Sequence, residues 1–367
     1  MARILHIAPF NTAGVPLTFV QAERALGHES RLLTLGKTSR GYPEDICLDL
    51  PFLDFGLTRW AKKLVSPKER LQVNHRASIP SHIPRKWQPT KMENQLIKLR
   101  EKIWTSKINQ AIQQFQLLDF DVYQLDGGLE FYRDGRIVRG LKQKGKKIIC
   151  CYTGSDLRVR GVIPEIDALS DLNVTVEFDH QFLHPNIHHV LFPINPDRYG
   201  LKEKAGGDKL KIGHAPTSRR AKGSHLIIPI VRELEKQYPV ELVLIEKLPY
   251  PVALKRKAQC QIFIDQIGDL GYGINALEAL CMGIATCSCL APGFEEQYPD
   301  HPFITINEHN LKDALVQLIE DEAYREKKGQ EGRAWVRNHH DYRKVVQRIH
   351  RLAGLEESQP KIEYSFH

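Results

Sequence analysis

The 367-residue sequence has no apolar run of about eighteen residues, so we expect no membrane-spanning helix. Its first residues, MARILHIAPF, lack the longer apolar region and the small-residue cleavage site of a signal peptide. Cysteine is scarce and odd in number, with seven residues that lie mostly in apolar strand or helix patterns. This usage is typical of reduced, buried thiols in a cytoplasmic protein. The pair Cys287 and Cys289 lacks a second pair at zinc spacing, which argues against a zinc site.

Acidic residues are nearly absent from the segment between Leu57 and Lys91, where Glu69 alone stands against nine Lys or Arg. The excess of eight positive charges equals the net charge of +8 of the whole chain. Prolines at 67, 80, 84 and 89 interrupt any long helix there, so we interpret 57–91 as a basic insertion. Its basic residues are Arg59, Lys62, Lys63, Lys68, Arg70, Arg76, Arg85, Lys86 and Lys91.

Three partners suit this basic insertion. The apolar side chains of Trp60, Leu64, Val65 and Trp87 beside the charge favour an anionic membrane surface. A polyanionic acceptor such as an acidic polysaccharide comes second. Nucleic acid comes third and is not expected as a partner, because no recognition motif accompanies the charge. A plain solvated insertion with no partner is the remaining alternative.

Elsewhere the chain alternates between strand and helix patterns, which predicts parallel sheets covered by helices. The first unit runs from a strand at 3–9 through a glycine turn and a helix ending near Leu26 to a strand at 30–35. The length suffices for two such α/β domains. Further strands are expected at 121–125, 146–152, 171–176 and 189–192, and helices at 91–117, 135–143 and 341–352. A second alternation runs from 211 to about 306.

Two successive strand–turn–helix units lie between Lys211 and Ile284: KIGHAPTSRRAKG and FIDQIGDLGYGINALEALCMG. Anions bind where a strand leads into a helix, because free N–H groups and the positive end of the helix dipole point at them. The first turn carries cations before a helix near Gly223. The second carries glycines before a helix with Glu278, whose carboxylate can accept hydrogen bonds from ribose hydroxyls. Together they predict a nucleoside-diphosphate site, formed by the cations Arg219, Arg220 and Lys222 and the glycines 268, 271 and 273. The alternative is that the glycines only pack helix against strand and the cations are solvated.

The two motifs in this order resemble the donor half of GT-B glycosyltransferases of the retaining family 4. Lys222-Gly223 matches the basic turn of that family. Gly271-Tyr272-Gly273-Ile274, with Leu277-Glu278-Ala279-Leu280 and Gly283, matches its glycine–glutamate segment. The resemblance implies an α/β GT-B fold of two Rossmann-like, doubly wound domains facing a cleft. We expect an N-terminal acceptor-side domain at 1–196, a C-terminal nucleotide-sugar-binding domain at 197–338, and a final helix at 339–367 that crosses back to the first domain and continues into a tail.

The resemblance also implies the residues of the site. Lys222 and Arg219 would stabilise the leaving diphosphate, and Asp156 would act beside them from the first domain. Asp126, Gly127 and Asp156 are expected on the acceptor side, although either aspartate alternatively caps a turn. The donor-binding residues expected are Gly14, His214, Arg219, Arg220, Lys222, Gly271, Tyr272, Gly273, Ile274 and Glu278.

The implied activity is transfer of a sugar, with retention, from a nucleotide-diphosphate sugar to a cell-envelope or secreted glycan acceptor, with a lipid-linked acceptor as one version. No cofactor and no metal ion is expected, since no Asp-x-Asp pair is present to hold one. The expected place is the cytoplasm, including the inner face of the membrane.

Three positions depart from the family pattern. Thr153 and His214 stand where relatives often carry a histidine and an arginine, and Leu270 stands where the first glutamate of a pair is expected. Asp269 and the arginines at 219 and 220 are candidate replacements. These departures motivate the alternative of a degenerate, non-catalytic glycosyltransferase-like protein that binds a nucleotide or glycan and acts through partners.

Overall fold

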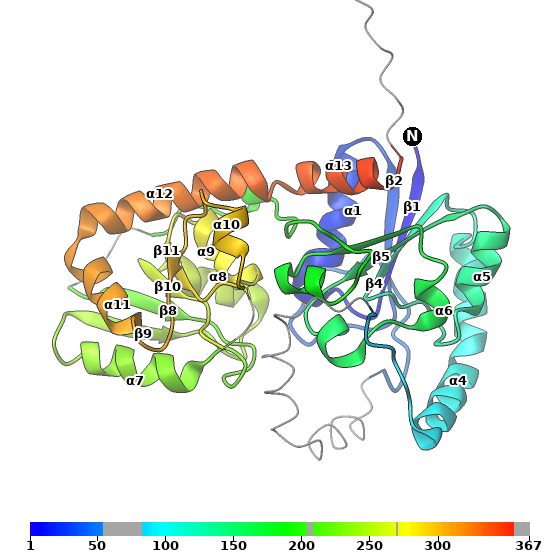
Figure 1. Cartoon of the computed structure of the whole chain (residues 1–367), viewed down its shortest axis with the longest axis horizontal. Helices are drawn as coiled ribbons and strands as arrows, with labels where there is room; N and C mark the ends of the chain where they lie inside the picture. Colours follow the sequence, from blue (N-terminus) through cyan, green and yellow to red (C-terminus); the bar gives the residue numbers. More distant parts are fainter. Residues whose placement is uncertain (54–82, 204–207, 269–270, 356–367) are drawn as a thin grey trace, which may run out of the picture.

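A computed structural model describes residues 1–53, 83–203, 208–268 and 271–355, which form two lobes that lie side by side (Figure 1). Each lobe is built on one parallel sheet covered by helices. Most of the basic insertion, together with Asp269 and Leu270, lies outside the described residues.

The first lobe contains a seven-stranded sheet of order β3-β2-β1-β4-β5-β6-β7. Its central strands β1, β4 and β5 are buried over nearly their whole length, as expected where both faces of a parallel sheet are covered. In β5, for example, all residues after Lys147 are buried. The strands are β1 (Arg3–Ala8), β2 (Glu29–Thr34), β3 (Ile46–Cys47), β4 (Val122–Asp126), β5 (Lys147–Tyr152), β6 (Leu172–Thr175) and β7 (His188–His189).

The helices of the first lobe begin where the sequence supplies caps. Helix α1 (Val15–Ala25) starts after Gly14, which has a left-handed φ of 73°, and carries a proline in its first turn. Helix α4 (Lys91–Phe115) opens with a capping box in which Thr90 and Glu93 bond each other's backbone N–H groups. The remaining helices are α5 (Arg136–Gln143), α6 (Pro164–Asp167) and the single-turn elements η1 (Thr12–Gly14), η2 (Asp156–Arg160) and η3 (Phe178–Phe182).

The second lobe contains a five-stranded parallel sheet of order β12-β11-β10-β8-β9. Its strands are β8 (Leu210–His214), β9 (Val240–Leu244), β10 (Ile262–Ile264), β11 (Ala285–Ser288) and β12 (Ile304–Thr305). Its helices are α7 (Ser224–Leu234), α8 (Tyr250–Ala258), α9 (Ile274–Cys281), α10 (Phe294–Gln297), α11 (Leu311–Glu320) and α12 (Glu322–His339).

The strand order reverses once in each sheet. In the first sheet β1 pairs with β2 on one side and β4 on the other, and in the second β8 pairs with β9 and β10. Parallel sheets bind ligands outside the carboxyl ends of the strands at such reversals. The loops after β1, β4, β8 and β10 are therefore the first places to look for a site.

Two connections join the lobes. The first runs between β7 and β8 through η4 (Pro196–Arg198), and the second joins α12 to α13 (Tyr342–Leu352). The backbone of Ile194 accepts the N–H of Tyr342 at 3.0 Å and donates to the carbonyl of His340 at 2.9 Å, so the two connections are bonded to each other. Figure 1 shows α12 over the second lobe and α13 over the first. Helix α13 packs on α1, as expected for the final helix, while the boundaries at 196 and 338 stay predictions.

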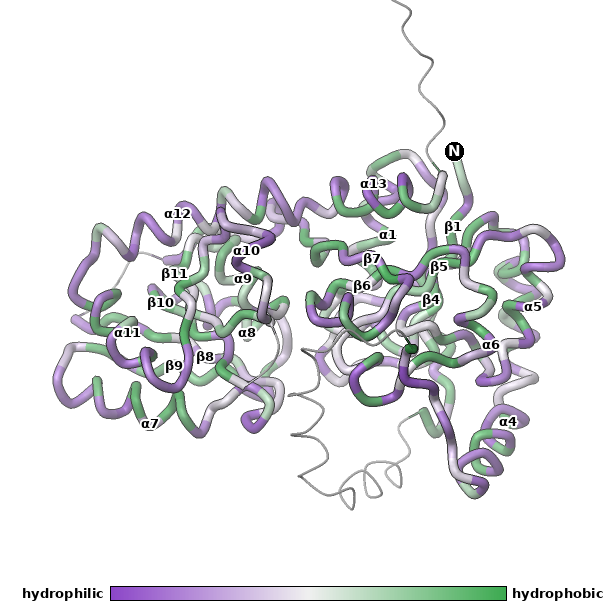
Figure 2. Tube along the Cα trace, in the orientation of Figure 1, coloured by the Kyte–Doolittle hydropathy of each residue, from purple (hydrophilic) through white to green (hydrophobic). Residues whose placement is uncertain are grey.

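The buried apolar residues follow the strand patterns. In Figure 2, β4 and β5 are mainly hydrophobic, whereas α12 carries long hydrophilic stretches. All seven cysteines are free thiols, and five are buried, with Cys47 and Cys289 partly exposed. The strand expected at 189–192 is observed as β7 over His188–His189, after which the Val190 N–H still donates to the Thr175 carbonyl of β6 at 2.8 Å.

Candidate functional site

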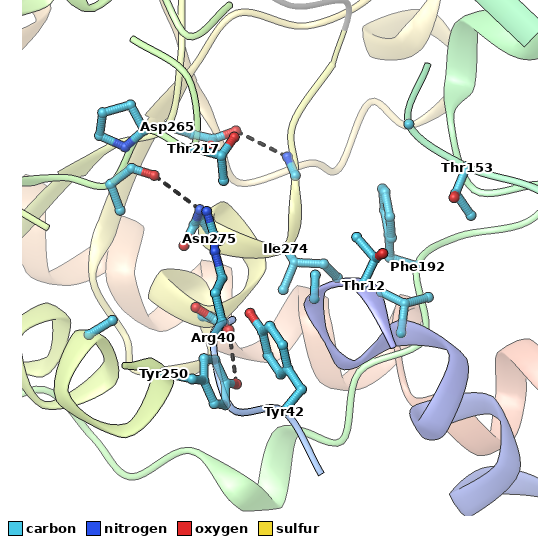
Figure 3. Close-up of a pocket in the computed structure, with 18 of the residues that line it drawn as sticks. Thr12, Arg40, Tyr42, Thr153, Phe192, Thr217, Tyr250, Asp265, Ile274 and Asn275 are labelled. Carbon is cyan, nitrogen blue, oxygen red and sulfur yellow. Dashed lines mark hydrogen bonds between the residues drawn. The ribbon is translucent and has the colours of Figure 1, made fainter. Parts of the chain in front are cut away.

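A cavity of about 300 Å³ lies between the lobes, at the carboxyl ends of the strands where both sheets reverse. Loops of both lobes line it, and Figure 3 shows the side chains that point into it. From the first lobe come Thr12, Ala13, Val15, Pro16, Arg40, Tyr42, Asp126, Thr153, Gly154, Glu177 and Phe192. From the second come Ala215, Pro216, Thr217, Lys222, Ile245, Lys247, Leu248, Tyr250, Ala253, Asp265, Gly273, Ile274, Asn275 and Glu278.

Lys222 and the start of α9 meet in this cavity. The Lys222 Nζ lies 3.5 Å from Oδ2 of Asp265, the residue that follows β10. The same carboxylate oxygen accepts the backbone N–H of Gly273 at 3.0 Å. A Cβ added at Gly273 would lie 3.6 Å from Lys222 Nζ, an ordinary contact distance, so the cation lies directly beside the start of α9. A cation and a helix N-terminus side by side suit a phosphate group.

Glu278 lies one turn into α9 and is held by two partners. Its Oε1 accepts a hydrogen bond from the Tyr250 hydroxyl at 3.0 Å (Figure 3), and its Oε2 is paired with Lys257 Nζ. Lys257 also donates to the Asn275 side-chain oxygen at 2.8 Å. Both Lys257 and Glu278 are buried, so each ion needs the other to offset its desolvation. The carboxylate is thereby fixed at the cavity wall, and its remaining lone pairs can accept ligand hydroxyls.

The first lobe brings a carboxyl group to the opposite wall. Asp126 ends β4 and lines the cavity, whereas Asp156 does not line it. Burial, and then the charge of Asp156, raise the pKa of Asp126 to about 8, with Arg160 acting in the opposite direction. Asp126 is therefore protonated at neutral pH and can donate as well as accept a hydrogen bond.

Asp156 and Gly127 lie next to each other behind the lining residues of the first lobe. Asp156 Oδ2 accepts the backbone N–H of Thr153 at 3.0 Å, as in the turn-capping alternative. Gly127 has a φ of 66°, and a Cβ there would lie 2.8 Å from Asp156 Oδ2. The structure thus favours the turn-capping alternative for Asp156, whose carboxylate closes the turn that presents Thr153 and Gly154, and its acceptor-side role stays a prediction.

Two predicted donor-binding residues are turned into the interior. His214 is buried in β8, with its Nδ1 at 2.8 Å from the Ile264 carbonyl and its Nε2 at 2.8 Å from the Ser224 hydroxyl. Tyr272 packs among Phe303, Phe294 and Trp335, and its hydroxyl bonds His340 at 3.1 Å. Neither side chain lines the cavity, so the structure does not support direct donor contacts for them.

The arginines of the basic turn point away from the cavity. Arg219 is exposed and forms a bidentate pair with Glu246 at 2.8 and 2.7 Å, and Arg220 is also exposed. Neither is among the lining residues. Gly14 and Gly271 are absent from the lining as well, although Ala13, Val15 and Gly273 beside them belong to it. Of the predicted donor-binding residues, the structure brings together Lys222, Gly273, Ile274 and Glu278.

Sequence reasoning missed several lining residues. Arg40 and Tyr42 lie in the loop before β3, where no glycine pattern or spacing singles them out. Tyr250 opens α8 after Pro249, and Asn275 donates from α9 to the Ala215 carbonyl at 3.1 Å. The sequence features that could have identified these two residues are the position of Tyr250 at a helix start and that of Asn275 between Ile274 and Glu278. Thr153, one of the departures from the family pattern, lines the cavity, whereas Leu270 and Asp269 lie outside the described residues.

Two features are absent from the described part of the chain, a cluster of metal ligands and a membrane-spanning helix. No group of three or more His, Cys, Asp or Glu residues is placed there to hold a metal ion. No helix in the same ranges has the length and apolar character needed to cross a bilayer. Trp87, expected as an apolar membrane anchor, is partly buried against the core of the first lobe, and its backbone N–H donates to the Val162 carbonyl at 2.8 Å.

No family model and no curated protein matches the sequence. The structure, however, is similar to solved glycosyltransferases over almost its whole length. Sucrose-phosphate synthase from Thermosynechococcus elongatus has a TM-score of 0.58 and 11% identity, covering 95% of this chain and 98% of that one. Anabaena HepE in complex with UDP-glucose has a TM-score of 0.56 and 11% identity, covering 96% and 100%.

The catalytic domain of starch synthase IV from Arabidopsis thaliana, bound to ADP and acarbose, has a TM-score of 0.59 and 12% identity, covering 96% of this chain and 99% of that one. Identities this low establish the architecture alone. The two parallel sheets, the cavity between them and these likenesses together identify the chain as a protein of the GT-B glycosyltransferase fold.

Proposed function

We propose that the protein is a retaining, metal-independent glycosyltransferase of family 4 type. In this proposal it transfers a sugar from a nucleotide-diphosphate sugar to a cell-envelope or secreted glycan acceptor, including a lipid-linked one. One observation carries the proposal: Lys222, the N-terminus of α9 at Gly273 and the held carboxylate of Glu278 line a single cavity, which Asp126 closes from the other lobe. The complexes of HepE with UDP-glucose and of starch synthase IV with ADP support a nucleotide ligand.

Each group has a separate task in this reaction. Lys222 and the Gly273 N–H bind the diphosphate and stabilise the charge that grows on it as the sugar leaves. Glu278, fixed by Tyr250 and Lys257, accepts hydrogen bonds from the ribose hydroxyls. Asp126 orients a hydroxyl of the sugar or of the acceptor. The leaving phosphate takes the proton of the attacking hydroxyl, so no protein nucleophile is needed. The reaction takes place in the cytoplasm, at the inner face of the membrane when the acceptor is lipid-linked.

The alternative is a non-catalytic protein of the same fold that binds a nucleotide or glycan and acts through partners. The buried His214 favours it, because both ring nitrogens are hydrogen-bonded inside the lobe and the side chain cannot replace a phosphate-binding arginine. Arg219 and Arg220 do not fill that place either, since neither lines the cavity.

Hydrolysis of a panel of nucleotide-sugars without acceptor separates the two functions. Release of nucleotide is expected for the enzyme, whereas tight binding without release is expected for the non-catalytic protein. A thermal-shift screen against UDP, GDP, ADP, CMP and TDP identifies the base. A ligand present at a hundred times its dissociation constant stabilises the native state by about 2.7 kcal/mol. If no nucleotide shifts the melting temperature, the donor site is wrongly assigned.

A further inference from the structure

The charges around the cavity leave a guanidinium of the first lobe without a carboxylate partner. Four carboxyl groups line the cavity, and three of them are paired: Asp265 with Lys222, Glu278 with Lys257 and Glu177 with Arg158. The fourth, Asp126, is protonated at neutral pH, because burial raises its pKa to about 8. Among the described residues, Arg40 forms no salt bridge with a carboxylate, although it lines the same cavity.

Arg40 is positioned by contacts between the lobes. Its carbonyl accepts the N–H of Tyr250, at the start of α8, at 3.3 Å. Two residues later, the Tyr42 ring lies 4.7 Å from the Tyr250 ring. Burial, and then the charge of Glu278, raise the pKa of Tyr42, while the neighbouring Arg40 acts in the opposite direction. These contacts tie the loop of the first lobe to the donor wall of the second, and Figure 3 shows the Arg40 side chain extending into the cavity.

The described residues of the second lobe offer a diphosphate two ammonium groups in the cavity, Lys222 and Lys247, but no guanidinium. Lys222 shares its charge with the buried Asp265, and the exposed arginines 219 and 220 point elsewhere. Arg40 is exposed and has no carboxylate partner among the described residues. A guanidinium is more weakly hydrated than an ammonium, and its planar fork can bind two phosphate oxygens at once.

We propose that Arg40 binds the diphosphate of the donor from the first lobe, opposite Lys222 of the second, so that both halves of the protein hold the same anion. This inference rests on the proposed function. It adds to that function a phosphate-binding guanidinium, which comes from a loop of the first lobe.

Isothermal titration of the full chain with UDP, GDP and ADP, and with uridine, guanosine and adenosine, tests the assignment. Arg40→Ala should weaken binding of the nucleoside diphosphate that the wild type prefers by roughly ten- to a hundred-fold, the range for a charge-assisted hydrogen bond. Binding of the matching nucleoside, which has no phosphate, should be unchanged. Arg40→Lys should restore part of the affinity, because the charge returns without the fork.

Two controls separate this role from a structural one. Arg232→Ala removes an equally exposed arginine, on α7, which does not line the cavity, and it should bind as the wild type does. The melting temperature of Arg40→Ala without ligand should match that of the wild type, because Arg40 is exposed and its loop is held to Tyr250 through the Arg40 carbonyl. The inference is overturned if Arg40→Ala binds the diphosphate normally, or if it loses nucleoside and diphosphate equally. If the wild type binds none of the diphosphates, the proposed function fails together with it.

Discussion

The carboxylate of Asp265 bonds both the Lys222 ammonium, at 3.5 Å, and the backbone N–H of Gly273, at 3.0 Å. It thereby joins the basic turn before α7 to the glycine turn before α9. The Asp265 side chain is 1% exposed, so its charge depends on these bonds. Removing Lys222 therefore affects folding as well as phosphate binding.

The Lys222→Ala substitution should weaken nucleoside-diphosphate binding by about ten- to a hundred-fold, because one charge-assisted bond to phosphate is lost. The melting temperature should fall too, since the buried Asp265 carboxylate loses a cation. The double variant Lys222→Ala with Asp265→Asn should recover much of the melting temperature without recovering affinity. Titration calorimetry and thermal unfolding measure the two effects separately. Unchanged affinity in the single variant would show that Lys222 does not contact phosphate.

The Glu278→Gln substitution keeps the shape of the side chain and removes its charge. Affinity for a free nucleoside diphosphate should fall, because the ribose hydroxyls lose a charged acceptor, while inorganic pyrophosphate should bind as before. Competition with a fluorescent nucleotide reports both affinities. Glu278→Gln leaves the buried Lys257 without its carboxylate partner. The double variant Lys257→Met with Glu278→Gln removes that unpaired charge, and it should still lose affinity for the nucleoside diphosphate but not for pyrophosphate. Equal loss of pyrophosphate would instead assign Glu278 to folding.

Asp126 makes stability depend on pH in a predictable direction. Its folded-state pKa, about 8, lies above the usual value for aspartate because the group is buried. The contribution of the protonated form to stability is thus complete at low pH and is lost as pH rises through about 8. Asp126→Asn should raise the melting temperature at pH 9 and change it little at pH 4. Differential scanning calorimetry across this range checks the trend, and a constant difference at every pH would contradict it.

The basic insertion predicts binding to anionic membranes, although most of it lies outside the described residues. Each Lys or Arg near an anionic leaflet contributes about 1 kcal/mol, and the attraction decays within about 8 Å at physiological salt. The wild type should sediment with anionic liposomes at low salt and release at high salt. A variant with five basic residues replaced by Gln should no longer sediment with the liposomes, while its nucleotide affinity should be unchanged. The five residues are Arg59, Lys62, Lys63, Arg85 and Lys86.

A matched set of five exposed cations of the second lobe, changed to Gln, controls for total charge and should leave liposome binding intact: Lys209, Arg232, Lys236, Lys255 and Lys327. If neither the wild type nor the control variant sediments with anionic liposomes at low salt, the membrane surface is not a partner and a soluble polyanionic acceptor is favoured. Trp87 is partly buried against the core of the first lobe, and both Trp60 and Trp87 stay candidate apolar anchors.

The fold, and the presence of Lys222, Gly273 and Glu278 around one cavity, could be predicted because they depend on local patterns. The alternation of strand and helix patterns along the sequence predicted the two sheets. A helix was predicted at 91–117, and α4 is observed at Lys91–Phe115. Lys222, Gly273 and Glu278 were found because strand-to-helix turns have a spacing that phosphate and ribose binding requires.

The remaining site residues depend on directions that sequence spacing does not give. His214 lies on the strand that leads into the cavity, yet its ring turns toward Ser224 and the interior. Tyr272 stands between two glycines of the motif, but its ring belongs to an aromatic cluster. Arg40 reaches the cavity only because the two lobes face each other, and no local pattern encodes that contact between distant segments.

Helix α13 also affects the order in which the parts of the chain can fold during synthesis. Its buried residues Val346 and Ile349 belong to the same apolar cluster as Phe19 and Ala22 of α1, and His350 Nε2 lies 3.4 Å from the Glu23 carboxylate. Domains generally fold from the N-terminus as they are synthesised. Here, however, one face of α1 is covered by a segment made only after the entire second sheet. The first lobe therefore leaves the ribosome with an uncovered apolar strip on α1, which α13 covers only after the second sheet has been made.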